Sequence, residues 1–237
     1  MLARVALAAA VALVLAASAT ATSAVPERCL HGSEQAIRFR TSDGIRLAGA
    51  LLGKGKVGVV LVPQSNHDYC GFVPFARLLA ARGYLALSVS LRNHGSSGRE
   101  EVPNQHHPRD VAAAAKELRR RGATKVFLVG ASLGGTAVLT AAPDLSPPVA
   151  GVVDLSGPAE FTDMDALEAM PRLTAPALFV VGRLDTAFVS DTRSMYRAAA
   201  STDKKLVVRP GGEHGTALVD ARSGVVRNLV YGFLRGH

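Results

Sequence analysis

The chain has 237 residues and is 48% hydrophobic, which suits one α/β domain with a sizeable core and excludes an intrinsically disordered protein. Its formal net charge of +8 comes from scattered Lys and Arg, with one dense run, Arg119–Arg121, at the end of a helical pattern. Aromatic residues are few and Trp is absent, so a base-stacking surface is not expected. We therefore expect no nucleic-acid partner.

The first residues have the pattern of an export signal. Arg4 supplies a positive charge, Val5–Ala17 is an apolar run of about thirteen residues, and small residues follow it. We interpret residues 1–24 as a signal peptide and residues 25–237 as the mature catalytic domain, either secreted or held at the cell envelope. An uncleaved anchor is the alternative, which the short apolar run disfavours, and no later stretch predicts a membrane span.

The only two cysteines, Cys29 and Cys70, both follow the expected cleavage region. An even number of cysteines in an exported chain predicts a disulfide, here between the mature N-terminus and the loop after an early strand. Two separate thiols are the alternative.

The remaining chain alternates between strand and helix patterns. An alternating run over 35–52, interrupted by Asp43-Gly44, predicts a β-hairpin. Further strands are predicted at 57–62, 84–89, 125–130, 149–155, 176–182 and 206–209. Helices are predicted at 72–82, 110–121, 133–142, 191–200 and 217–234, with a short one at 166–170. This order predicts a single α/β domain with a mostly parallel sheet, an N-terminal antiparallel hairpin and helices on both faces.

The segment that carries chemistry runs from a predicted strand into a predicted helix. Gly130-Ala131-Ser132-Leu133-Gly134 matches G-x-S-x-G at this junction. A sharp strand-to-helix turn exposes the serine hydroxyl above the sheet, and glycines relieve the crowding around it. The helix N-terminus favours a developing oxyanion, and the Leu133 N–H is a natural donor to it. The motif alone is weak, but this setting predicts that Ser132 is a nucleophile.

A nucleophilic serine needs a base, which an acid in turn orients. Only His214 and His237 follow Ser132, and His237 ends the chain, so His214 is the candidate base. Asp185 follows the strand predicted at 176–182, at the sheet edge where such active sites lie, and is the preferred acid. Asp154, at the end of the preceding strand, is the rival.

These segments resemble the α/β-hydrolase family, in particular small lidless esterases and dienelactone-hydrolase-like members. The resemblance covers nearly the whole mature chain and rests on the serine turn, Gly182-Arg183-Leu184-Asp185, Glu213-His214-Gly215 and the loop Leu91–Gly98. It implies hydrolysis of small-molecule esters or related acyl compounds through an acyl-enzyme, with no cofactor and no metal. It leaves the oligomeric state open.

Two departures from the family pattern bear on the site. Where members often carry His-Gly after the third strand, this chain has Pro63-Gln64-Ser65-Asn66, so the backbone of Gln64 or Ser65 is the expected second oxyanion donor. The loop 91–98 has Asn93 where Gly is common, and His94 is interpreted as a structural residue. Only about twenty residues separate the strands at 149–155 and 176–182, which predicts a minimal cap and an open site.

Other readings remain. A serine peptidase or lactonase would use the same three residues. A non-catalytic binding module with this fold is a different class, and its mark would be a broken triad, whereas the candidate triad is complete. The pairs His67-Asp68 and His106-His107 lack the further ligands that a metal site needs.

Overall fold

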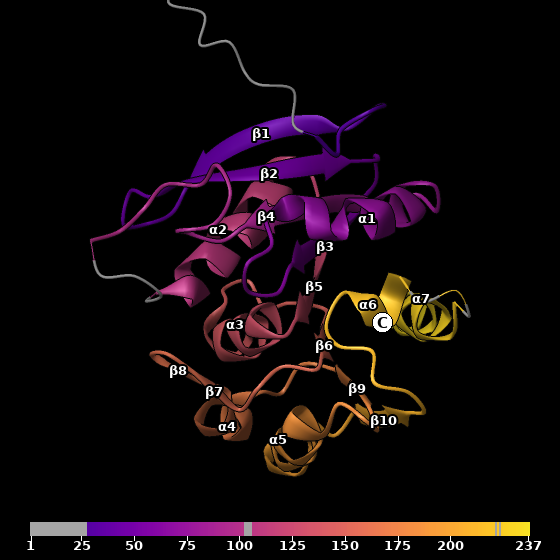
Figure 1. The fold of residues 1–237 in the computed structure, drawn as a ribbon. Helices are drawn as coiled ribbons and strands as arrows, with labels where there is room; N and C mark the ends of the chain where they lie inside the picture. Colours follow the sequence, from indigo (N-terminus) through magenta and orange to yellow (C-terminus); the bar gives the residue numbers. More distant parts are fainter. Residues whose placement is uncertain (1–27, 102–105, 221, 223) are drawn as a thin grey trace, which may run out of the picture.

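The structure, a computed structural model, describes residues 28–101, 106–220, 222 and 224–237 (Figure 1). The expected signal peptide therefore lies outside the described residues. One eight-stranded sheet organises the fold, in the order β1-β2-β4-β3-β5-β6-β9-β10. Strand β2 pairs antiparallel with both β1 and β4, and the remaining neighbours are parallel. The strands are β1 (Gln35–Arg40), β2 (Arg46–Leu52), β3 (Val57–Val62), β4 (Leu85–Ser90), β5 (Lys125–Ala131), β6 (Gly151–Leu155), β9 (Ala177–Gly182) and β10 (Lys204–Arg209).

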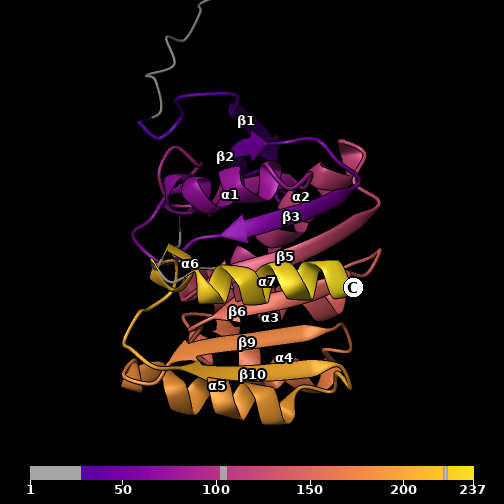
Figure 2. The same ribbon diagram turned by 90° about the vertical axis from the view of Figure 1, so that its right-hand side faces the viewer.

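Helices cover both faces of this sheet, as the alternating pattern predicts. The helices are α1 (Val73–Ala80), α2 (His107–Arg120), α3 (Leu133–Ala141), α4 (Ala166–Ala169), α5 (Thr186–Ala198), α6 (Ala217–Asp220) and α7 (Val225–Gly236). Helices α2 to α5 pack on one face, and α1, α6 and α7 pack on the other (Figures 1 and 2). In the described ranges, every helix is too short or too polar to cross a lipid bilayer.

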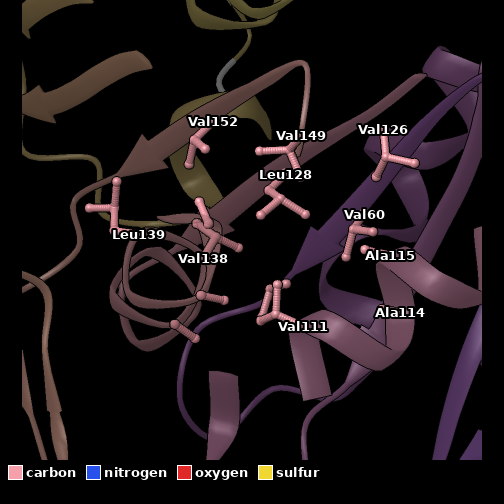
Figure 3. Close-up of a cluster of buried hydrophobic side chains, with 14 of the residues drawn as sticks. Val60, Val111, Ala114, Ala115, Val126, Leu128, Val138, Leu139, Val149 and Val152 are labelled. Atoms are coloured by element: carbon pink, nitrogen blue, oxygen red, sulfur yellow. The ribbon is translucent and has the colours of Figure 1, made fainter. Parts of the chain in front are cut away.

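The core forms because the central strands are apolar on both sides. Figure 3 shows Val60, Leu128 and Val152 of β3, β5 and β6 facing Val111 of α2 and Val138 of α3. All five side chains are fully buried. Such continuous apolar runs are the signature of parallel strands covered on both faces. Burial of this kind holds the carboxyl ends of β3, β5, β6 and β9 together at one edge.

Two predicted helices differ most from the observed ones. Helix α5 begins at Thr186, five residues before the predicted start at Asp191, with Asp185 at its N-cap position. The closing helix predicted at 217–234 is two helices, α6 and α7. Helix α6 ends at Asp220, and α7 begins after Gly224, whose φ of 63° is left-handed and cannot continue an α-helix.

Between β6 and β9 the chain adds a two-stranded ribbon, β7 (Glu160–Phe161) with β8 (Met164–Asp165), helix α4 and a single 3-10 turn at Met170–Arg172. These elements pack beside α3 and α5 (Figure 1). The minimal cap predicted from the short spacing is therefore observed.

The predicted disulfide joins Cys29 to Cys70, with their Cα atoms 5.6 Å apart. The bond spans 41 positions of sequence and fastens the N-terminal segment to the loop after β3. A crosslink over a loop of this length removes many conformations from the unfolded chain. Disulfides of this kind persist in oxidising compartments.

Replacing both cysteines by serine is expected to lower the free energy of unfolding by about 2–4 kcal/mol. Urea denaturation of the wild type and of the Cys29→Ser/Cys70→Ser variant measures the change. Wild type under reducing conditions should match the double variant, and coincident oxidised and variant curves would contradict the expectation.

Candidate active site

Ser132 lies at the turn between β5 and α3. Its backbone has φ 50° and ψ −121°, a conformation that costs a non-glycine residue energy and recurs at functional sites. The Ser132 N–H donates to the Leu155 carbonyl at the end of β6, at 2.9 Å, which fixes the turn to the sheet. The side chain is largely buried, with 8% of the residue exposed.

The two glycines of the motif are required by close packing. A Cβ atom on Gly130 would lie 2.1 Å from the Gly134 carbonyl oxygen, and one on Gly134 would lie 2.1 Å from the Val62 carbonyl oxygen. Neither site has room for a side chain without moving backbone. The first turn of α3 is therefore pressed against the end of β3.

This packing brings the expected oxyanion donors to one place. Leu133 is the first residue of α3, so its N–H has no partner inside the helix. Gln64 and Ser65 follow directly on the Val62-Pro63 segment that touches Gly134, and both are partly exposed. The segment that precedes Gln64 and Ser65 therefore touches the first turn of α3, where Leu133 lies.

His214 and Asp185 are joined by a hydrogen bond. His214 Nδ1 is 2.8 Å from Asp185 Oδ2, and the two side chains are 28% and 10% exposed. Asp185 precedes α5 but makes no side-chain hydrogen bond to that helix, so its carboxylate is directed to the imidazole. The Phe188 ring lies against the imidazole with its centroid 4.3 Å away. Among the described residues, Nε2 makes no hydrogen bond, so it is the ring nitrogen left to act as a base.

Backbone contacts hold this pair beside the serine turn. Leu184 N–H donates to the Gly211 carbonyl at 2.8 Å, which ties the loop of Asp185 to that of His214. A Cβ on Gly215 would lie 3.6 Å from Ala131 Cβ, so the residues following His214 and preceding Ser132 are neighbours. Among the described residues, no hydrogen bond joins Ser132 Oγ to His214. Such bonds are commonly long before substrate binds.

Gln64 makes a contact that the sequence did not indicate. Its side-chain oxygen accepts hydrogen bonds from Thr216 N–H and Thr216 Oγ1, at 3.0 and 3.1 Å. The loop after β3 is thereby fastened to the loop that carries His214. Contacts between residues 152 positions apart have no local sequence signal.

The rival acid, Asp154, lies on β6 opposite Gly130 of β5, not against His214. It is fully buried at the end of β6, and its Oδ1 accepts a hydrogen bond from Gly157 N–H at 2.9 Å. Burial raises its pKa to about 7, against the opposing effect of the Gly157 N–H. It makes no hydrogen bond to His214 in the described part of the chain, so the geometry favours Asp185.

The histidines of the pairs His67-Asp68 and His106-His107 lie in different environments. Within the residues that the structure describes, no group of three potential ligands is close enough to hold a metal ion. His67, Asp68 and His94 line a polar cavity of about 430 Å³, where His94 Nδ1 bonds the Arg92 carbonyl at 2.9 Å. His107 is buried, and burial first, then the nearby His94, lowers its pKa to about 4. It is therefore a neutral core residue at ordinary pH.

The fold is shared with several solved hydrolases. The esterase Pf2001 of Pyrococcus furiosus superposes with a TM-score of 0.76 at 17% identity, covering 85% of this chain and 91% of that one. The alpha/beta hydrolase GrgF of Penicillium sp. sh18 gives 0.75 at 16% identity, covering 86% and 98%. The esterase EaEST of Exiguobacterium antarcticum gives 0.69 at 15% identity, covering 85% and 100%.

Sequence comparison identifies the family directly. No curated protein matches the chain at a significant level. The sequence model of the alpha/beta hydrolase family, however, matches residues 59–219, which run from within β3 to beyond β10 and include all three residues of the candidate triad. This match supports a hydrolytic enzyme, and it shows that the protein is a member of the alpha/beta hydrolase family.

Proposed function

We propose that the protein is a serine hydrolase that cleaves carboxylic esters or related acyl compounds through an acyl-enzyme. The observation that carries the proposal is the hydrogen bond of 2.8 Å between His214 Nδ1 and Asp185 Oδ2, in the loops next to the strained turn of Ser132. A base oriented by an acid beside a serine in this conformation is the arrangement that activates a hydroxyl.

In the proposed reaction, Ser132 Oγ attacks the substrate carbonyl carbon while His214 Nε2 accepts the hydroxyl proton. Asp185 holds the imidazole through Nδ1–H and stabilises the imidazolium that forms. His214 then returns the proton to the departing alcohol, which leaves an acyl group on Ser132. A water molecule, deprotonated by His214, hydrolyses this ester and regenerates the serine.

Negative charge develops on the substrate carbonyl oxygen as each tetrahedral intermediate forms. The Leu133 N–H, at the start of α3, is the first proposed donor to this oxygen, and the Gln64 or Ser65 N–H is the second. Fixed backbone donors need no reorganisation when the charge appears. The Gln64–Thr216 hydrogen bonds support the proposal, because they join the loop that carries the second donor to the loop that carries His214.

Two further parts of the proposal concern substrate and location. The short segment between β6 and β9 leaves the serine turn without a large cap, which favours small or exposed acyl groups. We also propose export, with residues 1–24 as signal peptide and delivery to the cell envelope or exterior. The Cys29–Cys70 disulfide supports this, since such bonds form in oxidising compartments.

The test uses a fluorophosphonate probe and a panel of p-nitrophenyl esters on the purified, folded protein. We expect stoichiometric phosphonylation of the peptide that contains Ser132, and faster hydrolysis of acetate and butyrate esters than of long-chain esters. Lactone and peptide substrates, assayed in parallel, identify a lactonase or a peptidase. Folded protein that is neither labelled nor active on any substrate would contradict the proposal and favour a binding module.

A further inference from the structure

Asp154 is a fully buried carboxyl group beside the serine turn that the proposed mechanism does not use. It is the penultimate residue of β6 and is paired in register with Gly130, the first glycine of the serine motif, on β5. Its Oδ1 accepts one hydrogen bond, from Gly157 N–H at 2.9 Å. Its Oδ2 has no hydrogen-bond partner among the described residues. An ionised carboxylate left so incompletely solvated is costly, whereas a neutral acid costs far less.

Two glycines leave the space that this carboxyl occupies. A Cβ atom on Gly135 would lie 2.2 Å from Asp154 Oδ1, and one on Gly157 would lie 2.5 Å from the same atom. Gly135 belongs to the first turn of α3, and Gly157 to the turn that follows β6. The carboxyl group is therefore held between the helix that starts after Ser132 and the end of the neighbouring strand.

The turn closed by this carboxyl also holds the serine backbone. The Asp154–Gly157 hydrogen bond spans Leu155 and Ser156. The Leu155 carbonyl accepts the Ser132 N–H at 2.9 Å, and Ser156 N–H donates to the Val180 carbonyl of β9 at 2.9 Å. Ser156 is kept at φ 57°, a strained value for a non-glycine residue. Loss of the Asp154 contact would release this strain next to Ser132.

In the described part of the chain, no charged side chain offsets the burial of Asp154. Among the described residues, its Oδ1 packs against Gly135 of α3 and Gly157. Its register partners are Gly130 of β5 and Phe179 of β9, and none of these four residues titrates. Asp191, on α5, accepts the Ala159 N–H at 3.0 Å. Burial alone raises the pKa of Asp154 to about 7, opposed only by the Gly157 N–H. At slightly acidic pH the group is therefore a neutral acid.

We propose that Asp154 is a positioning residue for Ser132, and that it works in its neutral, protonated form. Neutral Asp154 keeps the turn 154–157 closed and the Leu155 carbonyl under the Ser132 N–H. Ionisation places an uncompensated charge between α3 and β6 and disturbs the serine turn. This inference rests on the proposed function, because it assigns Asp154 a role toward the proposed nucleophile.

The experiment measures the rate of Ser132 phosphonylation by a fluorophosphonate between pH 6 and 9. In this reaction Ser132 Oγ forms a bond to phosphorus, fluoride leaves, and the hydroxyl proton passes to the base, so no knowledge of the substrate is needed. Asp154→Asn keeps an oxygen for the Gly157 N–H and cannot ionise. Asp191→Asn, which alters another carboxylate that accepts a hydrogen bond from a backbone N–H, is the matched control.

We expect wild type and Asp154→Asn to react within about twofold of each other at pH 6. At pH 8 the wild-type rate should fall to about one-tenth of the Asp154→Asn rate, because a group with a pKa of about 7 is then about nine-tenths ionised. The Asp191→Asn ratio to wild type should stay constant across this range. Asp154→Ala, which loses the acceptor itself, should react more slowly at every pH.

The pH dependence of thermal unfolding is a second test of the protonation state of Asp154, and the direction of the expected change is known. The folded-state pKa of Asp154 lies above its ordinary value of 3.8, so the wild type loses stability as pH rises from about 4 through about 7. The Tm of Asp154→Asn relative to wild type should therefore increase over this window.

The outcomes separate the two proposals. Labelling of Ser132 with superimposable pH profiles for wild type and Asp154→Asn overturns the inference alone. A folded Asp154→Asn that is unreactive at every pH also overturns it, since the carboxylate would then be the working form. A wild type that is never labelled on Ser132 overturns the proposed function and the inference with it.

Discussion

Replacing Ser132 by alanine is expected to lower kcat for ester hydrolysis by about 10⁴- to 10⁶-fold while the fold is retained. The variant removes the only atom proposed to form the acyl-enzyme. Residual activity would come from the oxyanion donors and from substrate binding, which still stabilise attack by water. Ser190→Ala, which changes an exposed serine on α5, is the matched control and should keep wild-type activity.

The other two residues of the candidate triad extend this test. His214→Ala is expected to lose about as much activity as Ser132→Ala, and combining both changes should cost little more, because the residues act as one unit. Asp185→Asn should lower kcat by about 10⁴-fold, since an amide favours the wrong imidazole tautomer. Circular dichroism verifies that each variant is folded.

The same series decides between the two candidate acids. Asp185 contacts the imidazole, and Asp154 does not. Asp154→Asn should therefore be nearly as active as wild type at pH 6, where Asp185→Asn is already impaired. The reverse order would make Asp154 the acid of the triad, and full activity of Ser132→Ala would remove the triad altogether.

Periodicity predicted most of this fold because the physics behind it is local. An unbroken apolar run such as Val57–Val62 is typical of a strand in a parallel sheet that is covered on both faces, and β3 has these bounds. The first residue of a helix is less predictable, because several residues in one stretch can be suitable N-caps. Asp191 is a suitable N-cap by type, yet α5 starts after Asp185, whose side chain is engaged by His214 rather than by the helix.

The candidate triad was predictable to a similar degree. Ser132 has a local motif, and His214 follows from chain order, so both can be proposed without knowledge of contacts. The choice between Asp185 and Asp154 depends on which carboxylate lies near the imidazole, and that is a tertiary distance. Gln64–Thr216 and the buried state of Asp154 also depend on tertiary packing, and no spacing in the sequence reports them.

A buried network of ion pairs around Arg92 likewise has no signal in the sequence. Arg92, in the loop after β4, is fully buried. Its Nε and Nη2 donate to Asp110 Oδ1 at 2.9 and 2.8 Å, and its Nη1 donates to Glu100 and Asp43 at 2.8 and 2.9 Å. The Arg92 N–H donates to Asp110 Oδ2 at 2.8 Å. The network joins the β1–β2 hairpin, the loop after β4 and helix α2 at one point.

Burial raises the pKa of Asp110 to about 6, although the Arg92 guanidinium opposes the shift. For Asp43, burial acts in the same direction, but hydrogen bonds from Arg92, Thr41 and Arg109 outweigh it and hold the pKa below its usual range. Asp110 is fully buried, so its negative charge depends on Arg92. Removing the guanidinium would leave that charge without compensation.

Replacing Arg92 by methionine, of similar length and without charge, is therefore expected to lower the free energy of unfolding by about 3–5 kcal/mol. For a domain of this size, the Tm should fall by roughly 6–20 °C. Arg172→Met, which breaks an exposed pair with Asp144, should cost at most about 1 kcal/mol. Chemical denaturation of the wild type and the two variants measures both changes in the free energy of unfolding.

Removing both Arg92 and Asp110 distinguishes the cost of an unpaired buried charge from the net contribution of the ion pair to the free energy of unfolding. In Arg92→Met/Asp110→Leu no buried carboxylate is left unpaired, so we expect most of the lost stability to return. A double variant as unstable as Arg92→Met would mean that the guanidinium stabilises the fold mainly through Asp43 and Glu100. A loss below about 1 kcal/mol in Arg92→Met would contradict the network's role altogether, because a buried pair would then behave like the exposed one at Arg172.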